Sequence, residues 1–72
     1  MSRLPVLSGS KLVGRLKSHG YEVDHQTGSH IILRHRNPPH KRLSVPNHRT
    51  LAKGTLRAIL RHAGLCVEDI VK

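Results

Sequence analysis

The chain has 72 residues, with 13 Lys and Arg against 4 Asp and Glu, and carries a net charge of +9 when its histidines are neutral. This length fits one small domain over residues 1–72 and excludes a large buried core. The excess of positive charge predicts binding to a polyanion, with nucleic acid as the first candidate. Tyr21 is the only aromatic residue, which excludes the stacking platforms that read single-stranded bases. A bound RNA should therefore be held through its phosphates and sugars.

The compartment is indicated by what the chain lacks. A single cysteine, Cys66, excludes an internal disulfide framework and indicates a reducing environment. The opening residues MSRLPVLSGSK contain no long apolar segment of the kind found in signal peptides. No stretch approaches the ~18 apolar residues of a membrane-spanning helix. We expect a cytoplasmic protein with no membrane partner.

A helix is predicted to begin after Ser8 or Ser10, either of which can cap it, and to end at Gly20. Alternating side chains then predict a strand over 21–26, with Tyr21 and Val23 facing inward. Thr27-Gly28 form a hairpin turn before a second strand over 30–35. The two prolines within 36–40 predict a loop, which is followed by a third strand over 41–46.

The last predicted helix covers about 53–63, ends at Gly64 and precedes a short turn within 67–71. The chain is therefore expected to be α+β, in the order α-β-β-β-α, with a three-stranded antiparallel sheet and both helices on one face. The covered face should carry Tyr21, Val23, Ile31, Leu33, Leu43 and Val45. The open face should carry Glu22, Asp24, His30, Ile32, Arg34, Arg42 and Ser44.

His30 is the first candidate for chemistry, because it would project from the open face directly after the turn. A histidine can remove the proton from a ribose 2′-hydroxyl or protonate the leaving 5′-oxygen, which cleaves RNA without a metal ion. Arg34 and Arg42 would supply cations for the phosphate, while Gly28 and Ser29 would allow its close approach and hold it. The alternative is that His30 is one solvated histidine among seven.

A second basic group recurs every four residues on the last helix, at Lys53, Arg57 and Arg61. Lys53 and Thr55 stand at the helix start, where free N–H groups attract phosphate. The stripe is either a nucleic-acid contact, a contact for an acidic protein, or a solvated helix face. His48 is either a supporting acid or base, a phosphate contact or a brace for its loop, and the last role is the preferred interpretation.

Metal chemistry is the weaker alternative. The histidines at 25, 30, 35 and 40 recur every five residues, a spacing that converges on neither a strand face nor a helix face, and 25, 35 and 40 receive no role. One cysteine is too few for a usual structural zinc site. Glu22 and Asp24 are expected to pair with the surrounding cations instead of holding Mg²⁺. We predict no metal and no cofactor.

Three segments in order resemble the HicA, or YcfA-like, toxin family. These are Gly28-Ser29-His30, Val45-Pro46-Asn47-His48 and the run KGTLRAIL over 53–60, preceded by SGSKLV at 8–13 and Gly20-Tyr21. The resemblance covers about residues 8–70. It departs from the family at Asn37-Pro38-Pro39, where members often have a tight Pro-Asp-Gly-type turn.

The resemblance implies a single HicA-like domain with a fold similar to a double-stranded-RNA-binding domain. It implies an mRNA interferase, the toxin of a type II toxin–antitoxin system that acts in stress responses, in which His30 is the one essential catalytic histidine. It also implies a HicB-type antitoxin that covers the active site. The alternatives are a non-catalytic double-stranded-RNA-binding module and a purely protein-binding domain.

Overall fold

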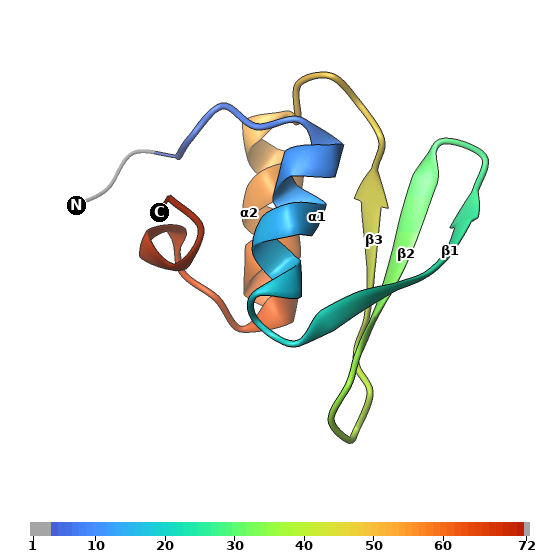
Figure 1. Ribbon diagram of the computed structural model, residues 1–72. Helices are drawn as coiled ribbons and strands as arrows, with labels where there is room; N and C mark the ends of the chain where they lie inside the picture. The colour runs from blue at the N-terminus through green and yellow to red at the C-terminus, as the bar shows by residue number, and fades with distance from the viewer. Residues whose placement is uncertain (1–3, 72) are drawn as a thin grey trace.

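The chain folds as two helices packed on one face of a three-stranded sheet, and the computed structural model describes residues 4–71. The elements are α1 (Gly9–Lys17), β1 (Tyr21–Thr27), β2 (His30–His35), β3 (Arg42–Pro46), α2 (Lys53–Ala63) and a short 3-10 turn η1 (Val67–Asp69). The predicted order α-β-β-β-α is confirmed. Figure 1 shows α1 and α2 side by side on one side of the sheet, whose other face no helix covers.

The sheet is antiparallel in the order β1-β2-β3, so that β2 is the central strand. Ile31 opposes Val45 and Leu33 opposes Leu43, and these four side chains are buried beneath the helices. Side chains alternate between the two faces of a strand, which leaves the even-numbered positions of β2 on the open face. The open face of β2 therefore carries His30, Ile32 and Arg34, as predicted.

α1 begins where the sequence places a cap. The hydroxyl of Ser8 accepts the backbone N–H of Lys11 at 3.1 Å, which satisfies one of the free donors of the first turn. Leu12, Val13 and Leu16 form the buried stripe of this helix. The regular helix ends at Lys17, and a turn leads to Gly20, where φ is 94° and glycine avoids the strain of a side chain.

α2 packs against β3 through Leu56, Ile59 and Leu60. Gly64 ends it with φ of 74°, and the N–H of Leu65 donates to the carbonyl of Leu60 at 2.9 Å. This is a Schellman close at the predicted end of the helix, and it satisfies carbonyls that the helix leaves free. The predicted final turn is η1.

Val23 is on the expected face of the sheet, but the expectation that it is covered is wrong, because 45% of this side chain is exposed. β1 lies at the edge of the sheet, and only Tyr21 at its start is buried. Val23 opposes Leu33 and so shares the helix face, but the helices bury only the start of β1. The edge of an otherwise apolar face is thereby left open to solvent.

The strict alternation predicted for β1 also fails, because the strand contains a β-bulge. Glu22 opposes Arg34 and Val23 opposes Leu33, but the next residue in register is His25, which opposes Ile32. The extra residue is Asp24. A bulge of one residue exchanges the faces of everything that follows it. His25 therefore lies on the open face, where alternation without a bulge would have placed it under the helices.

Candidate functional site

The turn between β1 and β2 is held against the end of β3. His30 opposes Pro46 in the sheet, and the N–H of Asn47 donates to the carbonyl of Ser29 at 2.6 Å. Gly28, with φ of 54°, supplies the left-handed conformation that the turn needs. These contacts bring together two segments of the sequence that are 16 residues apart, Gly28–His30 and Pro46–His48.

The start of α1 closes this arrangement from the other side. The N–H of Gly9 donates to the carbonyl of His48 at 2.9 Å, and a Cβ on Gly9 would collide with the carbonyl of Pro46. The loop after β3 is therefore braced by the backbone of His48. The His48 side chain is exposed and makes no hydrogen bond within residues 4–71.

Four of the seven histidine rings are engaged by other protein groups. His19 bonds the carbonyl of Asp69 at 3.0 Å, His35 the carbonyl of His19 at 3.0 Å, His40 the carbonyl of His35 at 3.1 Å, and His25 the carboxylate of Asp24 at 2.9 Å. The first three rings tie the α1–β1 turn, the β2–β3 loop and the C-terminal turn together.

Within residues 4–71, no hydrogen bond or ion pair engages the rings of His30, His48 and His62. Of these three, His30 is the one on the open face of the sheet, where its side chain is exposed. It stands on a regular strand next to a tight turn, so its backbone position is fixed while its ring is open to a ligand.

On the open face, some arginines are paired with carboxylates and one is not. Arg42 lies 3.5 Å from the carboxylate of Asp24, and Arg36 lies 3.7 Å from that of Glu22. The sequence-based expectation that these acids pair with cations is confirmed. Arg34 forms no ion pair with another residue of the range 4–71. It stands roughly 13 Å from His30 along β2, at the ~3.3 Å rise per residue of a strand.

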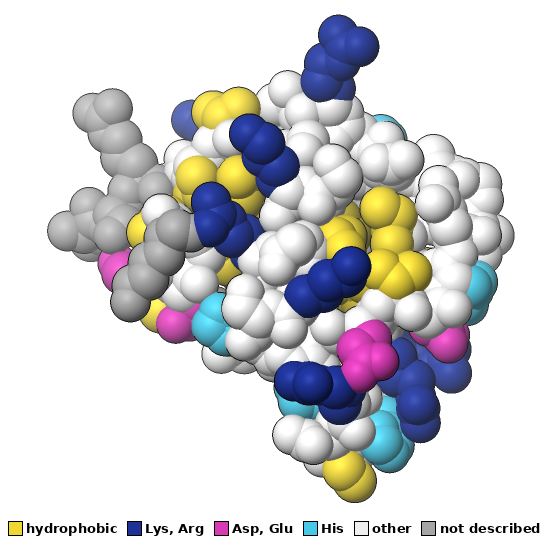
Figure 2. Space-filling view, in the orientation of Figure 1, with side chains coloured by type: hydrophobic (Ala, Val, Ile, Leu, Met, Phe, Trp, Pro, Cys, Tyr) yellow, Lys and Arg dark blue, Asp and Glu magenta, His cyan; other side chains and the backbone are white. Residues whose placement is uncertain are grey.

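The basic stripe of α2 lies on a different surface. Lys53, Arg57 and Arg61 line a groove of about 900 Å³ together with Leu60 of the same helix. The other lining residues precede α1 or follow α2, namely Leu4, Val6, Leu65, Cys66, Val67 and Glu68. α2 packs on the covered face of the sheet, so this groove and the open face are separate. Figure 2 shows Lys and Arg side chains over the helical side of the molecule, with few acidic side chains among them.

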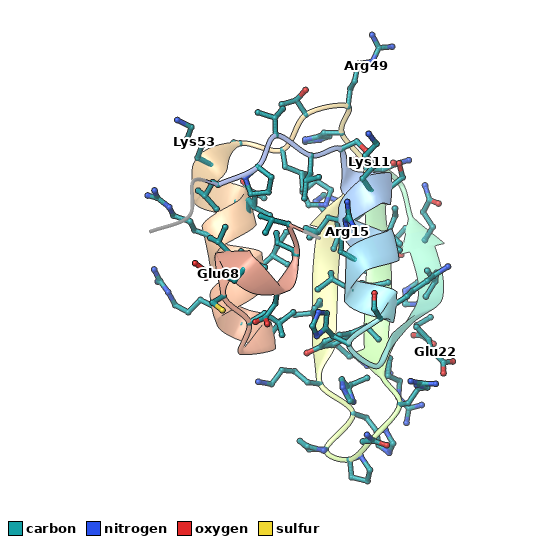
Figure 3. The ribbon with its side chains drawn as sticks, turned by 60° about the vertical axis from the view of Figure 1, so that its left-hand side comes forward. Lys11, Arg15, Glu22, Arg49, Lys53 and Glu68 are labelled. Atoms are coloured by element: carbon teal, nitrogen blue, oxygen red, sulfur yellow. The ribbon has the colours of Figure 1, made fainter. Side chains whose placement is uncertain are left out.

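The first turn of α2 has free backbone donors. Ala52 precedes it and supplies no side-chain cap, and the first turn contains no acidic residue. Such a helix start attracts anions. Lys53 and Arg49 extend from this end of the molecule in Figure 3. Thr55 is half-buried beside them.

Other reactive groups are few. Cys66 is exposed, and its thiol donates to the carboxylate of Asp69 at 3.2 Å, a hydrogen bond that raises the pKa of the thiol. Among residues 4–71, no three His, Cys, Asp or Glu side chains gather where they could hold a metal ion. Nor is any helix in that range long and apolar enough to cross a membrane.

Sequence reasoning gave no role to His25, which the bulge brings to the open face beside the predicted residues. The residues from Asp24 to Thr27 are all polar, so no apolar side chain marks which way this part of β1 faces. The one available signal was the pair Asp24-His25 itself, since an adjacent acid and imidazole can bond each other. The predicted site residues divide into the open-face group (Gly28, Ser29, His30, Arg34, Arg42) and the α2 group (Lys53, Thr55, Arg57, Arg61).

Comparison with known proteins gives one positive result. Residues 9–65 match the family model described as the HicA toxin of bacterial toxin–antitoxin systems. No curated protein and no solved structure matches the chain. The matched range includes α1, all three strands and α2, with both the Gly28–His30 and Pro46–His48 segments. Since the model covers more than half of the chain, the protein belongs to the HicA toxin family of bacterial toxin–antitoxin systems.

Proposed function

We propose that this toxin is a metal-independent endoribonuclease that cleaves mRNA in the cytoplasm, with His30 as an essential acid or base. The observation that carries the proposal is the state of the His30 ring. It is exposed on the open face, is unbonded within residues 4–71, and stands where the turn, β3 and α1 hold the backbone. A candidate acid or base needs such access to a substrate proton.

The proposed reaction uses the 2′-hydroxyl of the RNA as the nucleophile. The oxygen attacks the adjacent phosphorus, the bond to the 5′-oxygen breaks, and the products carry a 2′,3′-cyclic phosphate and a 5′-hydroxyl. One group must remove the 2′-hydroxyl proton and one must protonate the 5′-oxygen. Gly28 and Ser29 would admit and hold the phosphate, while Arg34 and Arg42 would stabilise its developing negative charge.

The metal-independent character is supported by the state of the two acids on the sheet. Glu22 and Asp24 are each within ion-pair distance of an arginine. Carboxylates engaged in this way are poorly placed to serve as the oxygen ligands that Mg²⁺ requires. We propose a mechanism that needs only side chains of the protein.

The α2 group would extend the RNA contact or serve a different partner. Lys53, Arg57 and Arg61 make no ion pair with another residue within 4–71, and the start of α2 is uncapped. These unpaired cations and the uncapped helix start support a second candidate function, in which the chain binds double-stranded RNA without cleaving it. A HicB-type antitoxin is proposed as the neutralising partner, and the uncovered sheet face with His30 is the surface that it would have to block.

The test is a cleavage assay with long mRNA in the presence of EDTA. Wild-type protein is expected to produce fragments that end in cyclic phosphate, and His30→Ala is expected to leave the RNA intact. His62→Ala is the matched control, because its ring is also unbonded within residues 4–71 but lies on α2. Cleavage by His30→Ala at the wild-type rate would contradict the proposal. Intact RNA that still binds the wild-type protein would favour the binding module.

A further inference from the structure

The bulge in β1 places a second histidine on the face that carries His30. Without it, Asp24 would oppose Ile32 and His25 would oppose Ile31, under the helices. With it, His25 opposes Ile32 and Thr27 opposes His30. Residues that oppose each other in an antiparallel pair share a face, and Ile32 shares its face with His30. His25 and His30 are therefore on the same open face of neighbouring strands.

The two histidines form a diagonal pair across β1 and β2. His25 opposes the residue two positions beyond His30 on the same face of β2. Diagonal neighbours of this kind lie about 7–8 Å apart at their backbones, within reach of each other's longer side chains. Both side chains are exposed. A phosphate between the two rings would have one imidazole on each side.

Asp24 orients the ring of His25. Its carboxylate lies 2.9 Å from Nδ1 of His25, and because an ionised carboxylate only accepts, Nδ1 carries the proton. The same oxygen lies 3.5 Å from Arg42 on β3, so the carboxylate is held from two sides. Nε2 of His25 is left to meet a substrate. The bond at Nδ1 persists whether or not Nε2 is protonated.

From this geometry we infer that His25 is the second catalytic residue, the general acid that protonates the leaving 5′-oxygen, and that Asp24 is its positioning residue. The inference rests on the proposed function and assigns the remaining role in it. His30 takes the proton of the 2′-hydroxyl, the new P–O2′ bond forms as the P–O5′ bond breaks, and His25 Nε2–H gives its proton to O5′. The two rings then exchange protons with water and regain their starting states.

The roles are assigned by the partners of the two rings. A general acid begins the cycle as an imidazolium, and a carboxylate at Nδ1 is the partner that holds an imidazolium in place. His25 has such a partner in Asp24. His30, which begins the cycle neutral, has no acidic partner within residues 4–71. The ring with a carboxylate partner is therefore assigned to the general acid, and the ring without one to the general base.

The experiment compares two leaving groups at one phosphodiester. The cleaved bond is first mapped on mRNA, and an oligoribonucleotide is then made with either the natural 5′-oxygen or a bridging 5′-sulfur at that bond. A thiolate leaves without being protonated, so the sulfur substrate does not need a general acid. His25→Ala should cleave the oxygen substrate roughly 10²–10⁴-fold more slowly and the sulfur substrate at nearly the wild-type rate. His30→Ala should fail on both.

The outcomes separate this inference from the proposed function. If His25→Ala cleaves the oxygen substrate like wild type, or is equally slow on both substrates, His25 is not the acid, while loss of cleavage by His30→Ala still supports the nuclease. If His30→Ala cleaves normally, the proposed function itself fails. Asp24→Asn should show a smaller loss on the oxygen substrate, again restored by sulfur, which a purely structural defect would not produce. Unfolding curves that match wild type confirm that the variants are folded.

Discussion

The ring of His35 links the turn before β1, at His19, to the loop after β2, at Asn37. Its Nδ1 accepts the N–H of Asn37 at 3.0 Å, so Nε2 carries the proton that is donated to the His19 carbonyl at 3.0 Å. The ring also meets Tyr21 edge-to-face, with centroids 4.7 Å apart. His35 is thus a structural residue, in contrast to His30 five positions earlier on the same strand.

Removal of the His35 ring should lower the stability of the fold, whereas removal of the His30 ring should leave it nearly unchanged. His35→Ala loses two hydrogen bonds and an aromatic contact, and we expect the free energy of unfolding to fall by about 2–3 kcal/mol. His30→Ala removes an exposed ring with no partner in the described chain, and the expected change is within about 0.5 kcal/mol. Urea unfolding curves measure both. A large destabilisation by His30→Ala would mean that its loss of cleavage could result from unfolding and not from the missing imidazole.

Glycines 9 and 14 lie in the same helix and should also differ. A Cβ at Gly9 would collide with the carbonyl of Pro46, whereas a Cβ at Gly14 would meet no atom within 4 Å apart from its chain neighbours and the backbone of its own helix. We expect Gly9→Ala to destabilise the protein by about 1–3 kcal/mol through overpacking. Gly14→Ala should stabilise it by about 0.5–1 kcal/mol, because alanine favours the helix.

Thermal unfolding of the two glycine variants gives the comparison, and cleavage gives a second readout. Because Gly9 holds the loop beside His30, Gly9→Ala should also slow cleavage at temperatures where it remains folded. Gly14→Ala should cleave like wild type. Equal stabilities for the two variants would show that α1 can move away from Pro46 without cost.

The element order and most of the core follow from apolar periodicity. Leu12 and Leu16 in α1, Leu33 and Val45 in the sheet, and Leu56 in α2 are at most 1% exposed. Most of their neighbours that face the other way are polar, with Ile32 beside Leu33 as an exception. Such a pattern has one arrangement that buries the apolar side chains, which is why it can be read from sequence.

The register of β1 could not be read in this way. From Asp24 to Thr27 every side chain is polar, so a shift of one residue changes little buried apolar surface. The extra residue, Asp24, lies 3.5 Å from Arg42 on β3, and sequence spacing does not reveal such a contact between separate strands. The separation of the α2 group from the open face, in contrast, follows from the predicted packing of both helices on the other face of the sheet.

Ionisation of Tyr21 should lower the stability of the fold at alkaline pH. Burial raises its pKa above the ordinary value of 10.0. The folded state therefore holds the phenol proton more tightly than the unfolded state, so the stability that this gives is complete below pH 10.0 and falls as the pH rises toward the folded-state pKa. Since Tyr21 is the only tyrosine and Trp is absent, tyrosinate absorbance follows this one group. Tyr21→Phe should remove this part of the alkaline loss of stability.

Cys66 should react slowly because of Asp69. The hydrogen bond from the thiol to the Asp69 carboxylate raises the thiol pKa, and only the thiolate is alkylated. Asp69→Asn should lower that pKa and increase the rate of alkylation near neutral pH. The rate measured against pH tests this, and Glu68→Gln should give a smaller increase, because Glu68 raises the thiol pKa less than Asp69 does. An unchanged profile in Asp69→Asn would contradict the assigned cause.

Two arginines near the end of β2 should contribute differently to RNA binding. Arg34 forms no ion pair within residues 4–71, whereas Arg36 is paired with Glu22 at 3.7 Å. A free cation that contacts a phosphate releases counterions, worth ~0.7 in the slope of log affinity against log salt for a single strand. Arg34→Gln should therefore weaken binding of RNA and lower that slope by about this amount.

Arg36→Gln is the control, because its charge is already balanced and its loss should change the slope less. Binding would be measured with His30→Ala protein, so that the RNA stays intact across the salt series. Equal slopes for wild type and Arg34→Gln would remove Arg34 from the proposed contact and shift attention to Lys53, Arg57 and Arg61 on α2.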